Sequence, residues 1–183
     1  MDRLERITIT LELCNRLKEA GSWCGETHIQ KAYYFLQELT EVPTGYEFVL
    51  YKHGPFSFDL RDDLNGMRAD GYLMLTPQPY PYGPSMLITD LGTNFRQRHG
   101  DFSQRYLERI KFVACKLGDK GVADLERLST ALLAWKEEPG ITANDLAIRV
   151  HGLKPHVSVE LARDSVDELF QIIEAVHSEQ YVA

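Results

Sequence analysis

The sequence predicts a mainly α-helical fold with a small β wing, an α+β class, from three observations. Apolar residues recur at three- and four-residue steps through most of the chain, which is the period of a buried helix face. An apolar run ends at 53–55, and an amphipathic segment begins directly afterwards at Ser57. Two short apolar runs, 72–75 and 86–89, flank the proline-rich segment 77–84, which is typical of a hairpin with a stiff tip. This order predicts a winged-helix-like N-terminal part followed by a helical C-terminal part.

Composition narrows the classes of partner. The chain has 183 residues, 44% of them hydrophobic, and a net charge of -7, which opposes strong nonspecific binding to nucleic acid or to anionic membranes. Three cysteines at unrelated spacings indicate reduced intracellular thiols. The first residues lack the apolar stretch of a secretory signal, and no apolar run approaches the ~20 residues of a membrane span. We therefore expect a cytoplasmic protein.

The N-terminal half begins with two predicted helices. The first covers 4–19 and ends at Gly21. Thr27 followed by Gln30 matches a capping box, so Thr27 is the expected N-cap of the second helix. The break at 41–45 separates that helix from a predicted strand over 46–51.

The corner after this strand has a local reason for each residue. Gly54 supplies an unusual φ, Pro55 fixes the next φ, and Ser57 caps the following helix, although contact with a partner is an alternative. That helix, 57–70, carries four acidic residues against two arginines. It occupies the position in which a winged helix reads DNA, yet its charge opposes contact with phosphates.

The C-terminal half is expected to be helical throughout. Apolar spacing predicts helices over 102–117, 122–135, 142–150 and 158–176, and Thr142 with Asp145 is the expected start of the third. The topology places a boundary near Gly100, which gives a winged-helix-like domain over 1–100 and a helical subdomain over 101–183 packed on it.

Two groups of residues are candidates for partner binding. Tyr80 and Tyr82 lie in the proline-rich tip and form an aromatic anchor for a protein, unless the tip folds back on its own domain. The segment 95–116 has six basic residues against two acidic residues, so it can contact phosphates or an acidic partner, or it is simply a charged outer face. The arginines of this segment proposed for contact are Arg96, Arg98, Arg105 and Arg109.

The sequence contains no recognisable catalytic or cofactor motif. Cys14, Cys24 and His28 supply only three metal ligands at irregular spacing, whereas a structural zinc site needs four, so no metal is expected. His53 and Asp59 are the only acid/base pair near each other, and no nucleophile elbow or glycine-rich phosphate loop is present. We therefore expect a protein that is not an enzyme and needs no cofactor.

The segments 31–36 and 51–60, with their later counterparts 89–92 and 153–158, resemble the YwgA-like family of uncharacterised bacterial proteins. More distantly, they resemble the SocA/Panacea antitoxin domain. The motif residues are Lys31, Tyr34, His53, Gly54, Pro55 and Ser57, of which His53 departs from the expected pattern. The resemblance implies a winged-helix-like domain followed by helices, and it brings no catalytic residues. The relatives imply a binding role, either neutralising a toxin or serving as an adaptor in a defence system.

Three functional hypotheses follow. The first is a non-enzymatic protein-interaction module of winged-helix type, an antitoxin-like, defence-system or regulatory adaptor subunit that contacts a protein partner and forms a homodimer. The alternative is a DNA-binding transcriptional regulator acting as a dimer, with the arginines of 95–116 on phosphates. The third is an enzyme, which requires His53 and Asp59 in one concave site.

Overall fold

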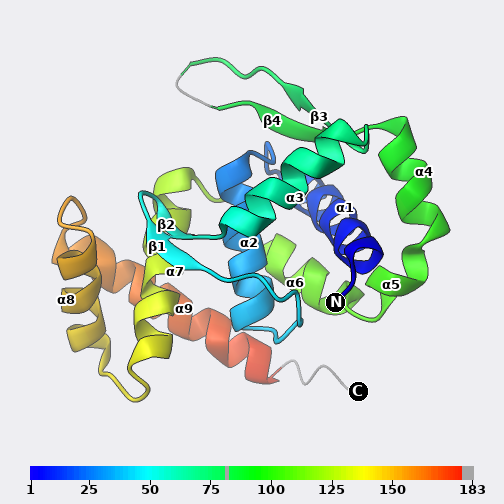
Figure 1. The fold of residues 1–183 in the computed structure, drawn as a ribbon. Coiled ribbons are helices and arrows are strands. Elements are labelled where there is room, and N and C mark those ends of the chain that lie inside the picture. The colour runs from blue at the N-terminus through cyan, green and yellow to red at the C-terminus, as the bar shows by residue number, and fades with distance from the viewer. Residues whose placement is uncertain (81–82, 179–183) are drawn as a thin grey trace. The chain divides into compact units, whose positions relative to one another are not determined.

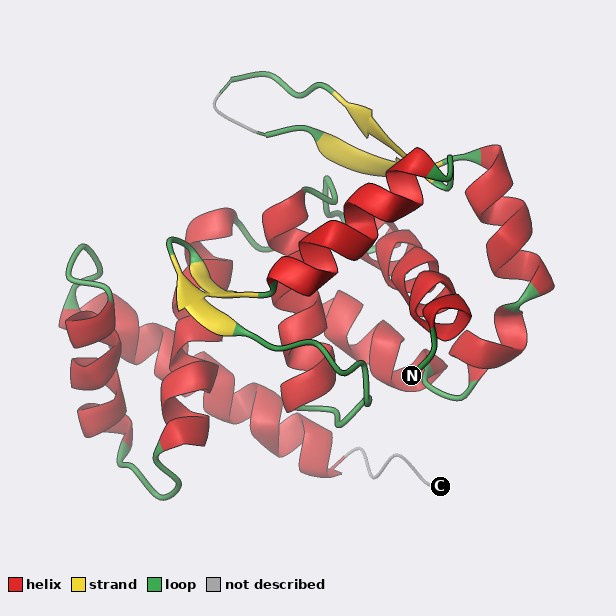
Figure 2. Cartoon of the chain, in the orientation of Figure 1, coloured by secondary structure: helices red, strands yellow, loops and turns green. Residues whose placement is uncertain are grey.

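A computed structural model describes residues 1–80 and 83–178, and these residues are mainly helical with two antiparallel β-hairpins (Figures 1 and 2). The predicted α+β class is therefore confirmed. In chain order the elements are α1 (Arg3–Glu19), α2 (Glu26–Glu38), β1 (Val49–Tyr51), β2 (Gly54–Phe56), α3 (Phe58–Ala69), β3 (Leu73–Thr76), β4 (Ser85–Ile88), α4 (Asp90–Arg98), α5 (Gly100–Gln104), α6 (Leu107–Leu117), α7 (Val122–Glu137), α8 (Ala143–Leu153) and α9 (Val159–Ser178).

The chain divides into two compact units. One short segment belongs to a different unit from the residues on either side of it. The first unit comprises Met1–Phe48 and Ser57–Lys120. The second comprises Val49–Phe56 and the chain from Gly121 onward, so the β1–β2 hairpin belongs with the C-terminal helices. Gly100 begins α5 inside the first unit. The predicted division into a winged-helix-like domain over 1–100 and a helical subdomain over 101–183 packed on it stays a prediction.

The first unit is built around α1. This helix starts with a capping box in which the Asp2 side chain accepts from the Glu5 backbone N–H and the Glu5 side chain accepts from that of Asp2. Helices α4, α5 and α6 and strand β4 all pack against α1. Ile9, Leu11 and Leu13 are completely buried, so α1 is covered on more than one face and lacks the single buried stripe expected from its sequence.

The β3–β4 hairpin is extended by a piece of chain that precedes α2. Leu75 pairs with Met86 and Thr76 with Ser85. On the other side of β4, Gly25 forms a bridge with Ser85, and the Met86 N–H donates to the Cys24 carbonyl at 2.9 Å. Strand β4 therefore lies between β3 and the segment 24–25.

Because of this bridge, α2 starts earlier than predicted. The structure places Gly25 at the N-cap, with no side-chain hydrogen bond, and Thr27 inside the helix, so the predicted Thr27 cap is wrong. The reason is tertiary. The chain enters α2 directly from its pairing with β4, and the extended Gly25 (φ -73°, ψ 164°) is the last residue before the helix.

Two other predicted elements differ for identifiable reasons. The strand expected over 46–51 begins only at Val49, because the Gln37 side chain bonds the backbone of Tyr46, accepting from its N–H at 3.0 Å and donating to its carbonyl at 2.9 Å. The helix expected over 102–117 is divided into α5 and α6 at Arg105 and Tyr106. The predicted caps Ser57 and Thr142 are confirmed, since each hydroxyl accepts from a backbone N–H three residues later.

The second unit packs α7, α8 and α9 together, and the β1–β2 hairpin contacts α7 through β2. Here the predicted corner at Gly54 and Pro55 is a strand, in which Leu50 pairs with Pro55 and Tyr51 with Gly54. Gly54 has φ +84° and follows a two-residue turn, where a side chain is disfavoured. A Cβ on Gly54 would lie 2.9 Å from the Ser129 Oγ, so this glycine also sets the approach of the hairpin to α7.

We predict that Gly54→Ala destabilises the protein more than Gly140→Ala does. Both residues have positive φ, 84° and 88°, which costs an alanine about 1–2 kcal/mol, but Gly140 has open space around it. The clash with α7 adds about 1–3 kcal/mol at position 54. Urea unfolding of the two variants measures the difference, and equal losses would contradict the close approach.

Candidate functional site

The four candidate arginines have different environments. Arg96 donates from Nη1 to the Glu12 Oε2 at 2.6 Å, and Arg16 donates from Nε to the Glu12 Oε1 at 2.7 Å. Glu12 is 5% exposed, so this pair of arginines neutralises a buried carboxylate on α1. Arg96 therefore ties α4 to α1 and is poorly placed to reach a phosphate.

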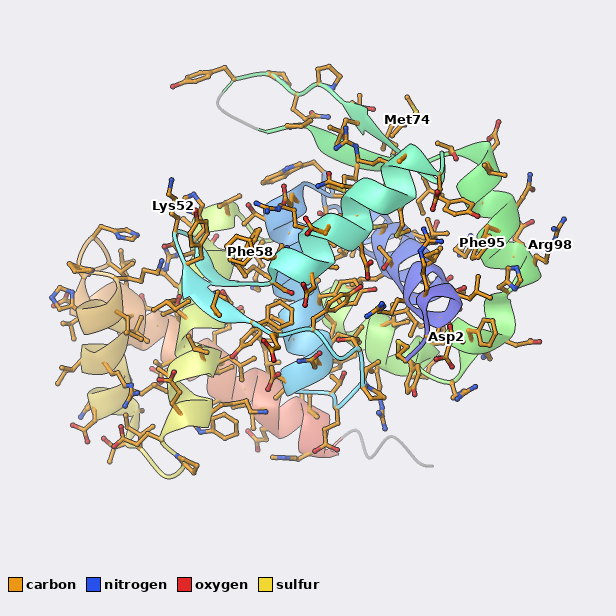
Figure 3. All side chains as sticks on the ribbon, in the orientation of Figure 1. Asp2, Lys52, Phe58, Met74, Phe95 and Arg98 are labelled. Carbon is orange, nitrogen blue, oxygen red and sulfur yellow. The ribbon has the colours of Figure 1, made fainter. Side chains whose placement is uncertain are left out.

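The remaining arginines lie along α4, α5 and α6. Arg98 is exposed and points away from α4 (Figure 3), and Arg105 is exposed at the end of α5. Arg109 is partly exposed on α6. The stretch 95–116 is thus less basic at its surface than its composition indicates, since Lys111 also pairs with Glu108 at 2.7 Å.

A column of aromatic rings supports this part of the surface. The ring centroids of Tyr72 and Phe95 are 4.7 Å apart, and those of Phe95 and His99 are 4.4 Å apart. His99 then stacks on Phe102 at 6.1 Å. These contacts join the turn before β3 to α4 and α5, so Arg98 and Arg105 project from a fixed scaffold.

In the loop between β3 and β4, Tyr80 is 98% exposed, so its ring is available to a partner. Tyr82 lies outside the described residues. Below the tip, the Gln78 Nε2 donates to the Ser85 Oγ at 2.9 Å, which joins the two sides of the loop.

The other motif residues in the first unit are internal. Lys31 is 1% exposed and Tyr34 is 3% exposed, with the Tyr34 ring 5.1 Å from that of Phe48. The neighbouring Gln30, which sequence reasoning missed, accepts from the Ser57 N–H and donates to the Ser57 carbonyl, both at 2.9 Å. A polar residue inside an apolar helix was the available signal. The Gln30 side chain positions the start of α3.

A groove lies between the second half of α3 and strand β3. Its volume is about 450 Å³, and its lining residues are Asn65, Arg68, Ala69, Leu73, Met74 and Leu75. We call this the α3–β3 groove. Its lining is mixed, with the polar Asn65 and Arg68 beside apolar side chains, and Met74, labelled in Figure 3, is 51% exposed. The groove combines segments that are separated by a turn, so sequence reasoning did not find it.

The α3–β3 groove carries one oriented positive charge. The Arg68 Nη1 donates to the Asn65 Oδ1 at 3.1 Å, which holds the guanidinium along the helix. The nearby Asp70 carboxylate pairs with Arg3 at 2.5 Å. Toward the other end of α3, Asp59 and Asp62 are exposed. The surface of this helix therefore carries more acidic than basic side chains, and Arg68 lies beside the apolar side chains of the groove.

The second unit contains a buried ion pair with two histidines beside it. The Glu126 and Lys154 side chains are 8% and 7% exposed, and the Lys154 Nζ lies 2.8 Å from the Glu126 Oε1. Lys154 also donates to the carbonyls of Tyr51 and Lys52 at 3.1 and 2.6 Å. The His53 Nδ1 is 3.3 Å from the Glu126 Oε2. One lysine thus joins α7 to the turn of the β1–β2 hairpin.

The pKa of Glu126 reflects two opposing effects. Burial alone would raise it, but hydrogen bonding and charge from Lys154 and His53 outweigh burial and hold the pKa below its ordinary value of 4.5. The folded protein therefore keeps this carboxylate ionised. The ion pair contributes stability above pH 4.5 and loses that contribution as the pH falls below it.

This cluster lacks a complete set of catalytic groups. The carboxylate beside His53 is Glu126, and both His53 and His156 are exposed. Within 1–80 and 83–178, no Ser, Thr or Cys side chain is hydrogen-bonded to either imidazole, and no group of three or more metal-ligand residues is found. The Glu126 carboxylate is also paired with Lys154. The arrangement is suited to holding the hairpin.

A serine–histidine contact in the first unit is buried. The Ser22 Oγ lies 2.9 Å from the His28 Nδ1, and the His28 Nε2 donates to the Leu117 carbonyl at 2.7 Å. Ser22 and His28 are 5% and 1% exposed, and burial lowers the pKa of His28. The Ser22 hydroxyl also accepts from the Cys24 N–H. The pair orders the 22–25 segment and has no open side for a substrate.

No protein-family model matches this chain, and no curated protein matches it in sequence. Among the described residues, every helix is too short or too polar to cross a lipid bilayer. The described residues form a mainly helical α+β protein with two separate hairpins, one of them beside the α3–β3 groove.

We predict that Lys154→Met destabilises the protein by about 3–5 kcal/mol, because it leaves a buried carboxylate without its partner. The double variant Glu126→Gln, Lys154→Met recovers much of this loss. Urea unfolding measures both. The single variant also loses the decline in stability below pH 4.5 that the ion pair confers. A Lys154→Met protein as stable as the wild type would show that the ion pair does not hold the hairpin.

Proposed function

We propose that this protein is a non-enzymatic protein-interaction module of winged-helix type. The element order supports the fold, because α1, the segment 24–25, α2, α3, β3 and β4 follow one another as in a winged helix. The position of β4 between β3 and 24–25 fits the same topology. In this arrangement α3 takes the place of the recognition helix, and 73–88 forms the wing.

The α3–β3 groove is the observation that carries the proposal. It places the exposed Met74 beside α3 in a recess that also contains Leu75, and exposed apolar side chains suit a protein partner better than a phosphate backbone. The exposed carboxylates of Asp59 and Asp62 on the same helix oppose DNA. Arg96, which a DNA-binding mode would use, is already paired with Glu12.

The partner in this proposal is a protein with an apolar anchor and acidic groups around it. The anchor enters the α3–β3 groove, where Arg68 meets a carboxylate. Tyr80 adds aromatic contact from the wing tip, and Arg98 and Arg105 attract acidic groups. Such a surface is suited to an antitoxin-like, defence-system or regulatory adaptor subunit working in the cytoplasm.

We predict that Met74→Glu removes partner binding, because it replaces an exposed apolar side chain of the groove by a charge that the partner would have to bury. Ile148→Glu is the matched control, since Ile148 is 58% exposed on α8, whereas Met74 is 51% exposed in the groove. Affinity purification after chemical cross-linking in the source cells, quantified by mass spectrometry, compares the two variants with the wild type.

The proposal expects a protein enriched by the wild type and by Ile148→Glu, and depleted at least tenfold with Met74→Glu. Identical recovery by all three would reject the groove as the binding surface. In parallel, fluorescence anisotropy with a 30-base-pair duplex tests the DNA alternative. Tight binding at low salt that weakens steeply as salt rises would favour that alternative.

A further inference from the structure

Strand β1 of the second unit is unusually exposed for an apolar strand. Val49, Leu50 and Tyr51 are 49%, 39% and 46% exposed, so side chains on both faces of the strand reach solvent. Its partner β2 is covered, since Gly54 and Pro55 are buried and β2 packs on α7. The hairpin has only two strands. It therefore presents the outer edge of β1, with three consecutive apolar residues, to its surroundings.

The pairing shows which backbone groups face outward. Leu50 pairs with Pro55, which has no N–H, whereas Val49 pairs with Phe56 and Tyr51 with Gly54. Hydrogen-bonded and non-hydrogen-bonded pairs alternate in an antiparallel ladder. Leu50 is therefore in the non-hydrogen-bonded pair, and its N–H and C=O point away from β2. Such an edge is a template for another strand.

We propose that β1 pairs with β1 of a second copy of this chain, antiparallel about a twofold axis at Leu50. The two Leu50 residues exchange both of their outward hydrogen bonds, and the two hairpins join into one four-stranded sheet. In this register Val49 of one copy faces Tyr51 of the other. All three exposed apolar residues then lie against apolar residues. A shift by two residues in one direction sets Leu50 against Lys52 of the other copy, and a shift in the other direction sets Tyr51 against Glu47.

The charges flanking β1 also favour a second copy of the chain as its partner. Exposed Glu47 precedes the strand, and exposed Lys52 and His53 form the turn that follows it (Lys52 is labelled in Figure 3). Antiparallel pairing brings the start of one β1 beside the turn of the other. The acidic residue of each copy therefore meets the basic turn of its neighbour at both ends of the contact.

The contact is small, so the dimer is weak. A standard stable interface buries about 1,600 Å², and two three-residue strands with their flanks cover much less. The association is therefore concentration-dependent. The inference does not depend on the proposed function, because the β1 edge and the α3–β3 groove share no residue.

Sedimentation equilibrium of the full chain, from micromolar to near-millimolar concentration, tests this dimer. The weight-average mass of the wild type is expected to rise from 21.0 kDa toward twice that value. Leu50→Lys sets two like charges opposite each other and weakens association at least tenfold, or about 1.4 kcal/mol. Ile148→Lys, at another exposed apolar residue of the second unit, leaves association unchanged.

A charge reversal tests the register. Glu47→Lys weakens association, because this register sets position 47 opposite His53 of the other copy, in its basic turn. Circular dichroism melting of each variant reports whether the fold survives. A wild type that stays at 21.0 kDa throughout overturns the proposal, as does equal association by Leu50→Lys and Ile148→Lys. Association that Glu47→Lys leaves unchanged overturns the register.

Discussion

The second unit depends on the buried ion pair between Glu126 and Lys154. Burying either charge alone would cost several kcal/mol, so each is tolerated only with the other in place. Lys154 also donates to the carbonyls of Tyr51 and Lys52, which fixes the turn of a hairpin that lies far away in sequence. Gly54 allows the hairpin backbone to approach α7. The ion pair and the glycine together explain why residues 49–56 belong with the C-terminal helices.

The eight residues 49–56 belong to the second unit, yet the first unit keeps its fold, because the chain is held in place directly after them. Gln30 bonds both backbone groups of Ser57, and Ser57 caps α3. Helix α3 therefore starts in a defined position, and the α3–β3 groove forms beside it. The motif residues around Gly54 and Ser57 serve the fold, whereas the surfaces that we propose for binding are the groove, the loop between β3 and β4, and the edge of β1.

Local signals predicted much of this architecture. Apolar spacing and the caps Ser57 and Thr142 indicated helices that the structure contains, since both signals act within one turn of helix. The failures involve distant partners. Thr27 was displaced as N-cap by the pairing of Gly25 with Ser85, and Gly54 and Pro55 became a strand because they pair with β1. Neither Glu126 nor Met74 carries a sequence signal of its role, because each acquires its surroundings only when separate segments meet.

Native-state hydrogen exchange of the hairpin amides tests most directly whether the hairpin folds with the second unit. The Val49 and Phe56 amides, which form a hydrogen-bonded pair, are expected to open with the same free energy as amides in the middle of α7. The protection of both sets of amides against exchange is expected to fall together as denaturant is added. Hairpin amides that exchange freely while α7 stays protected, or that follow α2 and α3 instead, would contradict this account.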